Sequence, residues 1–172
     1  GLGDVYKRQE LGPLMTAILF AGRSGSAFAA QLGTQKVNEE LNALTTFGLS
    51  PMYFLVVPRL IASSLVVPLL SVFATILGIL GGGLVMAMYD ITYTQFYVQL
   101  LKSVTVTDIV FGLVKAVIFG FVIALIGCQC GMNTGAGAAA VGSSTTKSVV
   151  KSIIWIVVID GAAALLTNRL GI

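Results

Sequence analysis

Long apolar stretches alternate with polar connections along this chain. Four stretches are long enough, or nearly so, to cross a bilayer, which takes about 20 apolar residues in a helix. They are Leu14–Leu32, Leu60–Met88, Ile109–Cys130 and Ser152–Asn168. None shows the alternation of polar and apolar residues that is typical of strands in a membrane β-barrel. The pattern therefore predicts an all-α, polytopic integral membrane protein with about four transmembrane helices.

The second stretch, Leu60–Met88, contains no charged residue and is longer than a bilayer requires. At 1.5 Å per residue it would extend over about 43 Å, whereas the hydrocarbon core is about 30 Å thick. We therefore expect this helix to tilt, or to bend near Pro68 or at Gly81-Gly82-Gly83.

Three connections join the stretches: Gly33–Arg59, Tyr89–Asp108 and Gly131–Lys151. The second is rich in aromatic residues, which suit a membrane interface, and the third is rich in Gly, Ala, Ser and Thr. The first and third share one side of the membrane. They hold four basic residues against two on the other side when residues 1–9 are set aside. This excess of basic residues favours a cytoplasmic location for both connections.

The first nine residues are polar and unpatterned, and the chain does not begin with Met. We expect residues 1–9 to be a non-native or disordered lead. We expect residues 10–172 to form one membrane domain that lacks an amino-terminal segment.

The composition supports the membrane assignment. Of the 172 residues, 56% are hydrophobic and only 10% are charged, whereas a soluble domain has about 25% charged residues. The net charge of +3 is too small, and its basic residues too scattered, for a nucleic-acid-binding surface.

Three charged residues fall inside the apolar stretches: Arg23, Lys115 and Asp160. Charged side chains are costly in hydrocarbon, so each is expected to face protein or water. Counted from the outer ends of their spans, all three lie at similar depth, roughly 9–13 Å. They fit two interpretations that can both hold: an ion-pair network that joins the helices, and a polar lining of a transport path.

The first connection contains a short amphipathic pattern. Val37, Leu41 and Leu44 have the spacing of one helical face, and Gly48 and Pro51 follow. We therefore expect a helix at about residues 36–48. Such a helix can lie on the membrane surface, or it can dock into a groove on a cytoplasmic partner.

The sequence offers little catalytic chemistry. Histidine is absent, no Ser or Cys lies beside an evident base, and the Gly-rich segment lacks the Gly-Lys-Ser/Thr ending of a phosphate-binding loop. Cys128 and Cys130 are too few for a structural zinc site. We therefore predict no enzymatic activity, no cofactor and no metal in this chain.

The order of motifs along residues 10–170 resembles that of the MlaE (YrbE) permease family. In the first half the resemblance is carried by Glu10-Leu11-Gly12-Pro13, Ala21-Gly22-Arg23-Ser24-Gly25-Ser26-Ala27, Leu32-Gly33-Thr34, Glu39, Leu41, Ala43-Leu44, Gly48, Pro51 and Pro58-Arg59. In the second half it is carried by Gly131, Thr134-Gly135, Val141-Gly142, Thr145-Thr146 and Val149-Val150.

This resemblance implies a function. It implies a multi-pass permease subunit of an ABC transporter in the bacterial inner (cytoplasmic) membrane, which moves phospholipids or related lipids between membranes. It also implies a homodimer with a cytoplasmic ABC ATPase, which hydrolyses the ATP, and a lipid-binding partner with an MCE domain. The first connection would be the helix that couples to the ATPase, through Glu39, Glu40, Leu41, Ala43, Leu44 and Gly48.

The chain departs from the family pattern at four positions. Gln31 stands where the family commonly has an acidic residue, and Glu40 stands where it commonly has Gln. Ala139 and Ser143 stand where charged residues are common. Two other functions remain open on the residues alone: a membrane scaffold without a transport path, and a proton-coupled carrier that uses Asp160.

Overall fold

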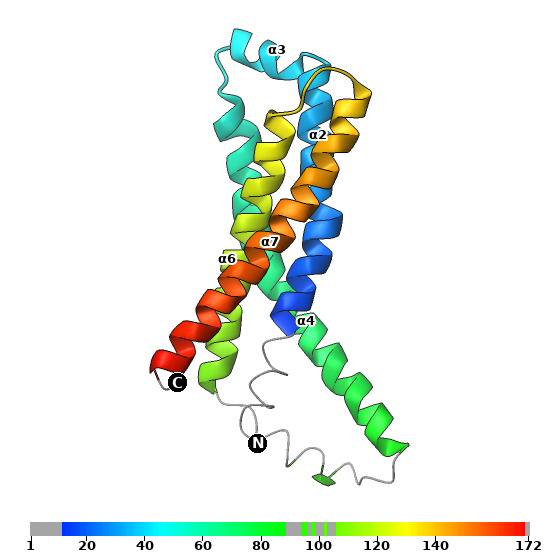
Figure 1. Cartoon of the computed structure of the whole chain (residues 1–172), viewed down its shortest axis with the longest axis vertical. Helices are drawn as coiled ribbons and strands as arrows, with labels where there is room; N and C mark the ends of the chain where they lie inside the picture. Colours follow the sequence, from blue (N-terminus) through cyan, green and yellow to red (C-terminus); the bar gives the residue numbers. More distant parts are fainter. Residues whose placement is uncertain (1–11, 89–93, 96–97, 99–101, 103–105, 171–172) are drawn as a thin grey trace.

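The structure is a computed structural model of the whole chain. It describes residues 12–88, 94–95, 98, 102 and 106–170 (Figure 1). Every element within these residues is a helix, so the predicted all-α architecture is confirmed. The expected lead at residues 1–9 and much of the aromatic-rich connection lie outside the described residues.

The first helix is continuous from residue 12 to Val37. Its middle turn is the π-helix η1 (Ala21–Gly25), and α2 (Ser26–Val37) follows directly. A π turn leaves carbonyl groups without their usual helical partners. Ser26 compensates, because its hydroxyl donates to the carbonyl oxygens of Gly22 (2.6 Å) and Arg23 (2.9 Å).

Three longer helices complete the bundle. The π-helix η2 (Met52–Val56) leads into α4 (Val57–Ala87), which contains Pro68. The others are α6 (Val106–Met132) and α7 (Ala138–Leu170). The short α3 (Glu40–Thr46) crosses one end of the bundle (Figure 1).

Among the residues that the structure describes, three helices are long and apolar enough to cross a membrane: Met52–Val85, Val106–Met132 and Ala138–Thr167. The predicted polytopic architecture is confirmed, with a count one lower than the predicted number of about four. The predicted span Leu14–Leu32 is helical but not among the three. It carries Arg23 and many small residues, and protein covers much of it, since α2 packs against both α6 and α7.

The predicted Gly-rich connection 131–151 is mostly helical. Only residues 133–137 separate α6 from α7, so α7 begins 14 residues before the predicted span. The hydroxyl groups of this polar helix find acceptors on backbone carbonyls. Those of Thr145 and Thr146 both donate to the Gly142 carbonyl, and that of Ser148 donates to the Gly25 carbonyl on the first helix.

Glycines allow the helices to approach closely. A Cβ on Gly127 would lie 2.7 Å from the Gly25 carbonyl oxygen, and one on Gly120 would lie 2.4 Å from the Ser63 carbonyl oxygen. At these two positions a larger side chain would force the helices apart. Gly78 and Gly81 of α4 differ, because they have open space around them.

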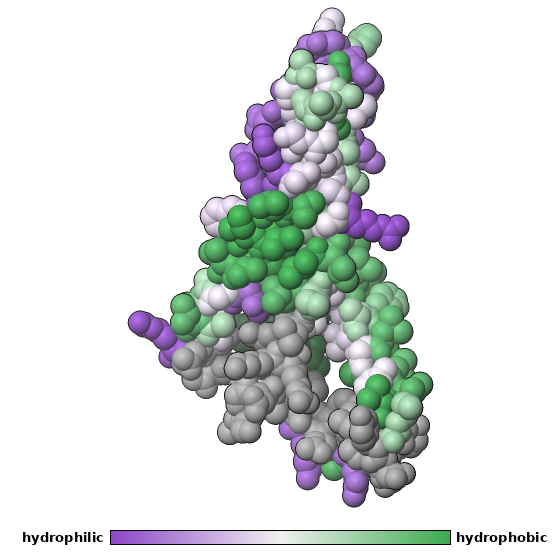
Figure 2. All heavy atoms as spheres, turned by 45° about the vertical axis from the view of Figure 1, so that its right-hand side comes forward, coloured by the Kyte–Doolittle hydropathy of each residue, from purple (hydrophilic) through white to green (hydrophobic). Residues whose placement is uncertain are grey.

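The outer surface is divided along the bundle. Figure 2 shows apolar side chains over the middle and lower parts and polar ones toward the α3 end. Large apolar side chains on α4, α6 and α7 are exposed, among them Phe73, Leu77, Val110, Trp155 and Leu165. A surface of this kind fits lipid rather than water.

Candidate functional sites

The helix predicted at about residues 36–48 is shorter in the structure. α2 continues through Val37, and α3 begins only at Glu40. Between them Glu39 adopts a left-handed conformation, with φ 60°. This conformation costs a residue with a Cβ about 1–2 kcal/mol. The side chain of Glu39 accepts a hydrogen bond from Asn42, and its carbonyl accepts one from the Ala43 N–H (3.0 Å).

Gly48 ends α3, as the sequence predicts. It has φ 76°, which favours glycine because glycine lacks a Cβ. Its N–H donates to the Thr45 carbonyl (3.0 Å), and the Leu49 N–H donates to the Leu44 carbonyl (3.0 Å). These two bonds form a Schellman motif, which fixes the direction in which the chain leaves α3.

The apolar face of α3 turns toward its own chain. Leu41 is only 8% exposed, and α3 contacts α2. The outer side of the segment carries Glu39, Glu40 and Ala43, which are exposed, and ends in Phe47, which is 81% exposed. A partner that docks here would therefore meet Ala43 and Phe47 rather than Leu41.

The first and third connections lie at the same end of the bundle (Figure 1). Lys36, near the end of α2, donates a hydrogen bond from Nζ to the carbonyl oxygen of Met132, the last residue of α6 (2.8 Å). A cation at a helix C-terminus is stabilised by the partial negative charge there. Lys36 thus links the segment next to α3 with the turn between α6 and α7.

Two of the three intramembrane charges meet. Lys115 Nζ lies 2.6 Å from Asp160 Oδ1, and the two side chains are 10% and 18% exposed. Lys115 is nine residues from the start of α6, so the pair lies toward the end of the bundle opposite α3. The pair joins α6 to α7 next to the main hydrophobic core, which includes Ala116, Phe119 and Ile156.

Arg23 does not join this pair. It lies in η1, where it is exposed, and it forms no salt bridge with any residue that the structure describes. The expectation of one network of three charges at one depth is therefore met for Lys115 and Asp160 only.

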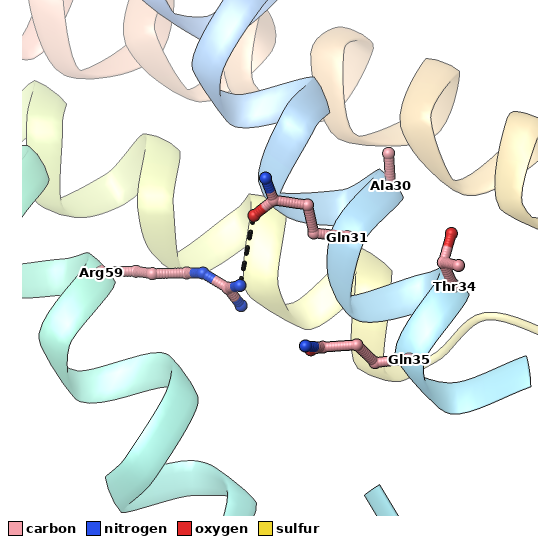
Figure 3. Close-up of a pocket in the computed structure, with 5 residues that line it drawn as sticks. All are labelled: Ala30, Gln31, Thr34, Gln35 and Arg59. Atoms are coloured by element: carbon pink, nitrogen blue, oxygen red, sulfur yellow. Dashed lines mark hydrogen bonds between the residues drawn. The ribbon is translucent and has the colours of Figure 1, made fainter. Parts of the chain in front are cut away.

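An open pocket of about 350 Å³ lies between α2 and α4. Ala30, Gln31, Thr34 and Gln35 of α2 and Arg59 of α4 line it (Figure 3). Arg59 Nη2 donates to Gln31 Oε1 (3.2 Å), where an acidic residue would form an ion pair. The guanidinium group also lies over the Phe28 ring, 5.8 Å from its centroid.

A model of the family described as Permease MlaE matches residues 5–166. The chain belongs to the MlaE permease family. The resemblance predicted from the motifs is therefore confirmed, and with the three apolar helices it makes this a multi-pass membrane protein.

Several curated proteins are similar to this MlaE-family chain. A probable ABC transporter permease protein of Synechocystis sp. is 41% identical over 157 residues, which cover 91% of this chain and 60% of the relative. One of Rickettsia typhi is 38% identical over 152 residues, which cover 87% and 58%. The chloroplastic protein TRIGALACTOSYLDIACYLGLYCEROL 1 of Arabidopsis thaliana is 39% identical over 153 residues, which cover 88% and 44%. The chain thus spans about three fifths, or less, of the length of these relatives.

Two features of this MlaE-family chain were missed by the sequence reasoning. Phe47 lies just beyond the apolar spacing used to define the short helix, so its exposure follows only from where Gly48 ends α3. The Arg59 pocket needs residues 24 positions or more apart along the chain, and no periodicity within one helix could have shown that they meet.

Proposed function

We propose that this chain is the transmembrane permease subunit of an ABC transporter that moves phospholipids or related lipids between membranes. The observation that carries the proposal is the family match, which covers residues 5–166 together with relatives named as ABC transporter permeases. The name of the Arabidopsis relative refers to a glycolipid, which supports a lipid as the substrate. ATP would be hydrolysed on a separate cytoplasmic ATPase.

The α3 end supports a coupling role. α3 projects exposed polar and apolar groups, and its direction is fixed at both ends by Glu39 and Gly48. We infer that Glu39, Glu40, Ala43 and Phe47 contact the ATPase, and that Leu41 and Leu44 hold α3 on its own chain. In this arrangement the α3 end faces the cytoplasm of a bacterial cell, and the permease lies in the inner membrane.

The Lys115–Asp160 pair bears on the alternative of a proton-coupled carrier. Asp160 lies 2.6 Å from the Lys115 ammonium group, so its carboxylate is already engaged in a salt bridge, which supports a structural role rather than that of a proton carrier. A salt bridge inside apolar helices instead supplies a compact polar group beside an apolar path, which is what a lipid with a polar head and apolar tails requires.

Partners complete the proposed transporter. We infer a homodimer of this permease, two ATPase subunits and an MCE-domain protein that carries lipid to or from it. The large exposed apolar faces of α4 and α7 leave room for a second copy and for lipid. A scaffold without a transport path would need none of these ATP-dependent parts.

Co-purification and reconstitution test the proposal together. The tagged permease, solubilised from its native membrane, should retain an ABC ATPase. The purified complex in liposomes should move a fluorescent phospholipid only with hydrolysable ATP. Transport that follows a proton gradient without ATP would refute the proposal in favour of the carrier. A complex without an ATPase and without lipid movement would instead support the scaffold.

A further inference from the structure

Arg59 carries a positive charge that no acidic residue neutralises among the described residues. Its Nη2 donates to the neutral Gln31, and its Nη1 is buried without a hydrogen-bond partner. The remaining residues that line the pocket are neutral as well. A buried donor that belongs to a cation is costly when it is unpaired, so the pocket favours an anion.

The same pocket also offers an acceptor. Gln35 Oε1 is buried and has no hydrogen-bond partner. Figure 3 shows the side chains of Gln31 and Gln35 extending from α2 toward Arg59 on α4. A ligand with a phosphate oxygen for Arg59 and a hydroxyl or ammonium donor for Gln35 would satisfy both groups.

The position of Arg59 along its span indicates the depth of the pocket. Arg59 directly precedes Leu60–Met88, the apolar stretch without a charged residue. It therefore falls where the apolar part of the span begins and hydrocarbon meets the lipid headgroups. The exposed Tyr53 and Phe54 lie in η2, six and five residues before it, as is typical of this boundary.

We propose that this pocket binds the phosphate of a membrane lipid in the leaflet on the α3 side. Arg binds phosphate through short, charge-assisted hydrogen bonds, and the open face of the pocket lets acyl chains remain in the bilayer. The site needs a membrane around the chain but does not depend on lipid transport or on an ATPase.

Lipid titration by native mass spectrometry tests the site in the full chain, purified in a neutral detergent. The probes are dioleoyl-phosphatidylglycerol, dioleoylglycerol with the same acyl chains but no phosphate, and inorganic phosphate. The phosphatidylglycerol should bind roughly tenfold more tightly than dioleoylglycerol, because one charge-assisted contact has this effect. Inorganic phosphate at the same concentration should not displace it. Displacement would assign the pocket to a free anion and overturn the lipid assignment.

Two variants locate the effect. Arg59→Gln removes the cation, and Gln31→Glu keeps Arg59 but gives it an internal carboxylate. If Arg59→Gln fails to fold, Gln31→Glu still tests the site, because it keeps Arg59. Each should lose the roughly tenfold preference for the phosphate-bearing lipid. Lys147→Gln, which removes an exposed cation outside the pocket, should retain it.

Unchanged lipid binding in the variants would overturn the proposal. If both pocket variants bind phosphatidylglycerol as the parent does, Arg59 is satisfied by other means, such as a turned Gln35 amide or a carboxylate of a partner subunit. The lipid site is then wrong.

Discussion

The Lys115–Asp160 salt bridge gives the sharpest test of how charge is stabilised inside this bundle. At 2.6 Å and an effective dielectric constant of about 20, two unit charges attract by about 6 kcal/mol before the cost of removing them from water. Removing one partner leaves the other charge buried, which costs about 3–5 kcal/mol. Asp160→Asn and Lys115→Met should therefore each lower the free energy of unfolding by about that amount.

The double variant should be more stable than either single variant, because two neutral side chains leave no buried charge. Unfolding in detergent micelles with increasing dodecyl sulfate, followed by circular dichroism, measures all three variants. Asp160→Asn with Arg23→Met is the matched control, since Arg23 is exposed and outside the pair, and it should restore nothing. If the Lys115→Met double variant is no more stable than the worse single variant, the pair does not stabilise the bundle as argued.

Three further predictions concern the α3 end and the helix contacts. Phe47→Asp should abolish retention of the ATPase at normal yield of folded permease, whereas Leu41→Asp should lower the yield itself; comparison of both variants by co-purification separates docking from folding, and equal retention in Phe47→Asp would contradict the docking surface. Ser143→Cys, with the two native cysteines replaced, should react with a membrane-impermeant thiol reagent only from the cytoplasmic face, and labelling from outside intact cells would reverse the orientation. Gly120→Ala should destabilise the bundle by about 1–3 kcal/mol, because its Cβ would meet the Ser63 carbonyl oxygen at 2.4 Å; unchanged dodecyl sulfate unfolding would show that α4 moves aside freely.

The fold could be predicted from the sequence where residues within one helix determine its position and its end. Apolar length located the helices that became α4 and α6, and Gly48 located the end of α3. Prediction was poorer where contacts between helices determine the secondary structure. Residues 138–151 have the composition of a loop, yet they form the start of α7, which packs against the first helix and donates a hydrogen bond to it from Ser148.

The candidate sites divide in the same way. Matched depth in two spans correctly suggested that Lys115 can reach Asp160. Depth in the membrane could not exclude Arg23 from this ion pair, because depth does not specify the direction in which a side chain leaves its helix. Similarly, the spacing of Leu41 and Leu44 identified an apolar face but not what covers it, and the structure shows Leu41 covered by its own chain.

The two halves of α4 differ in what surrounds them. Its first half packs closely on α6, where Gly120 lies against Ser63, whereas residues 72–81 are exposed at every position. The hydrogen bond from Lys36 to Met132 joins the end of α2 to the end of α6 as well. The packed helices, with the first half of α4 among them, would therefore move together, and the second half of α4 is the part that could change its angle without breaking contacts within the bundle.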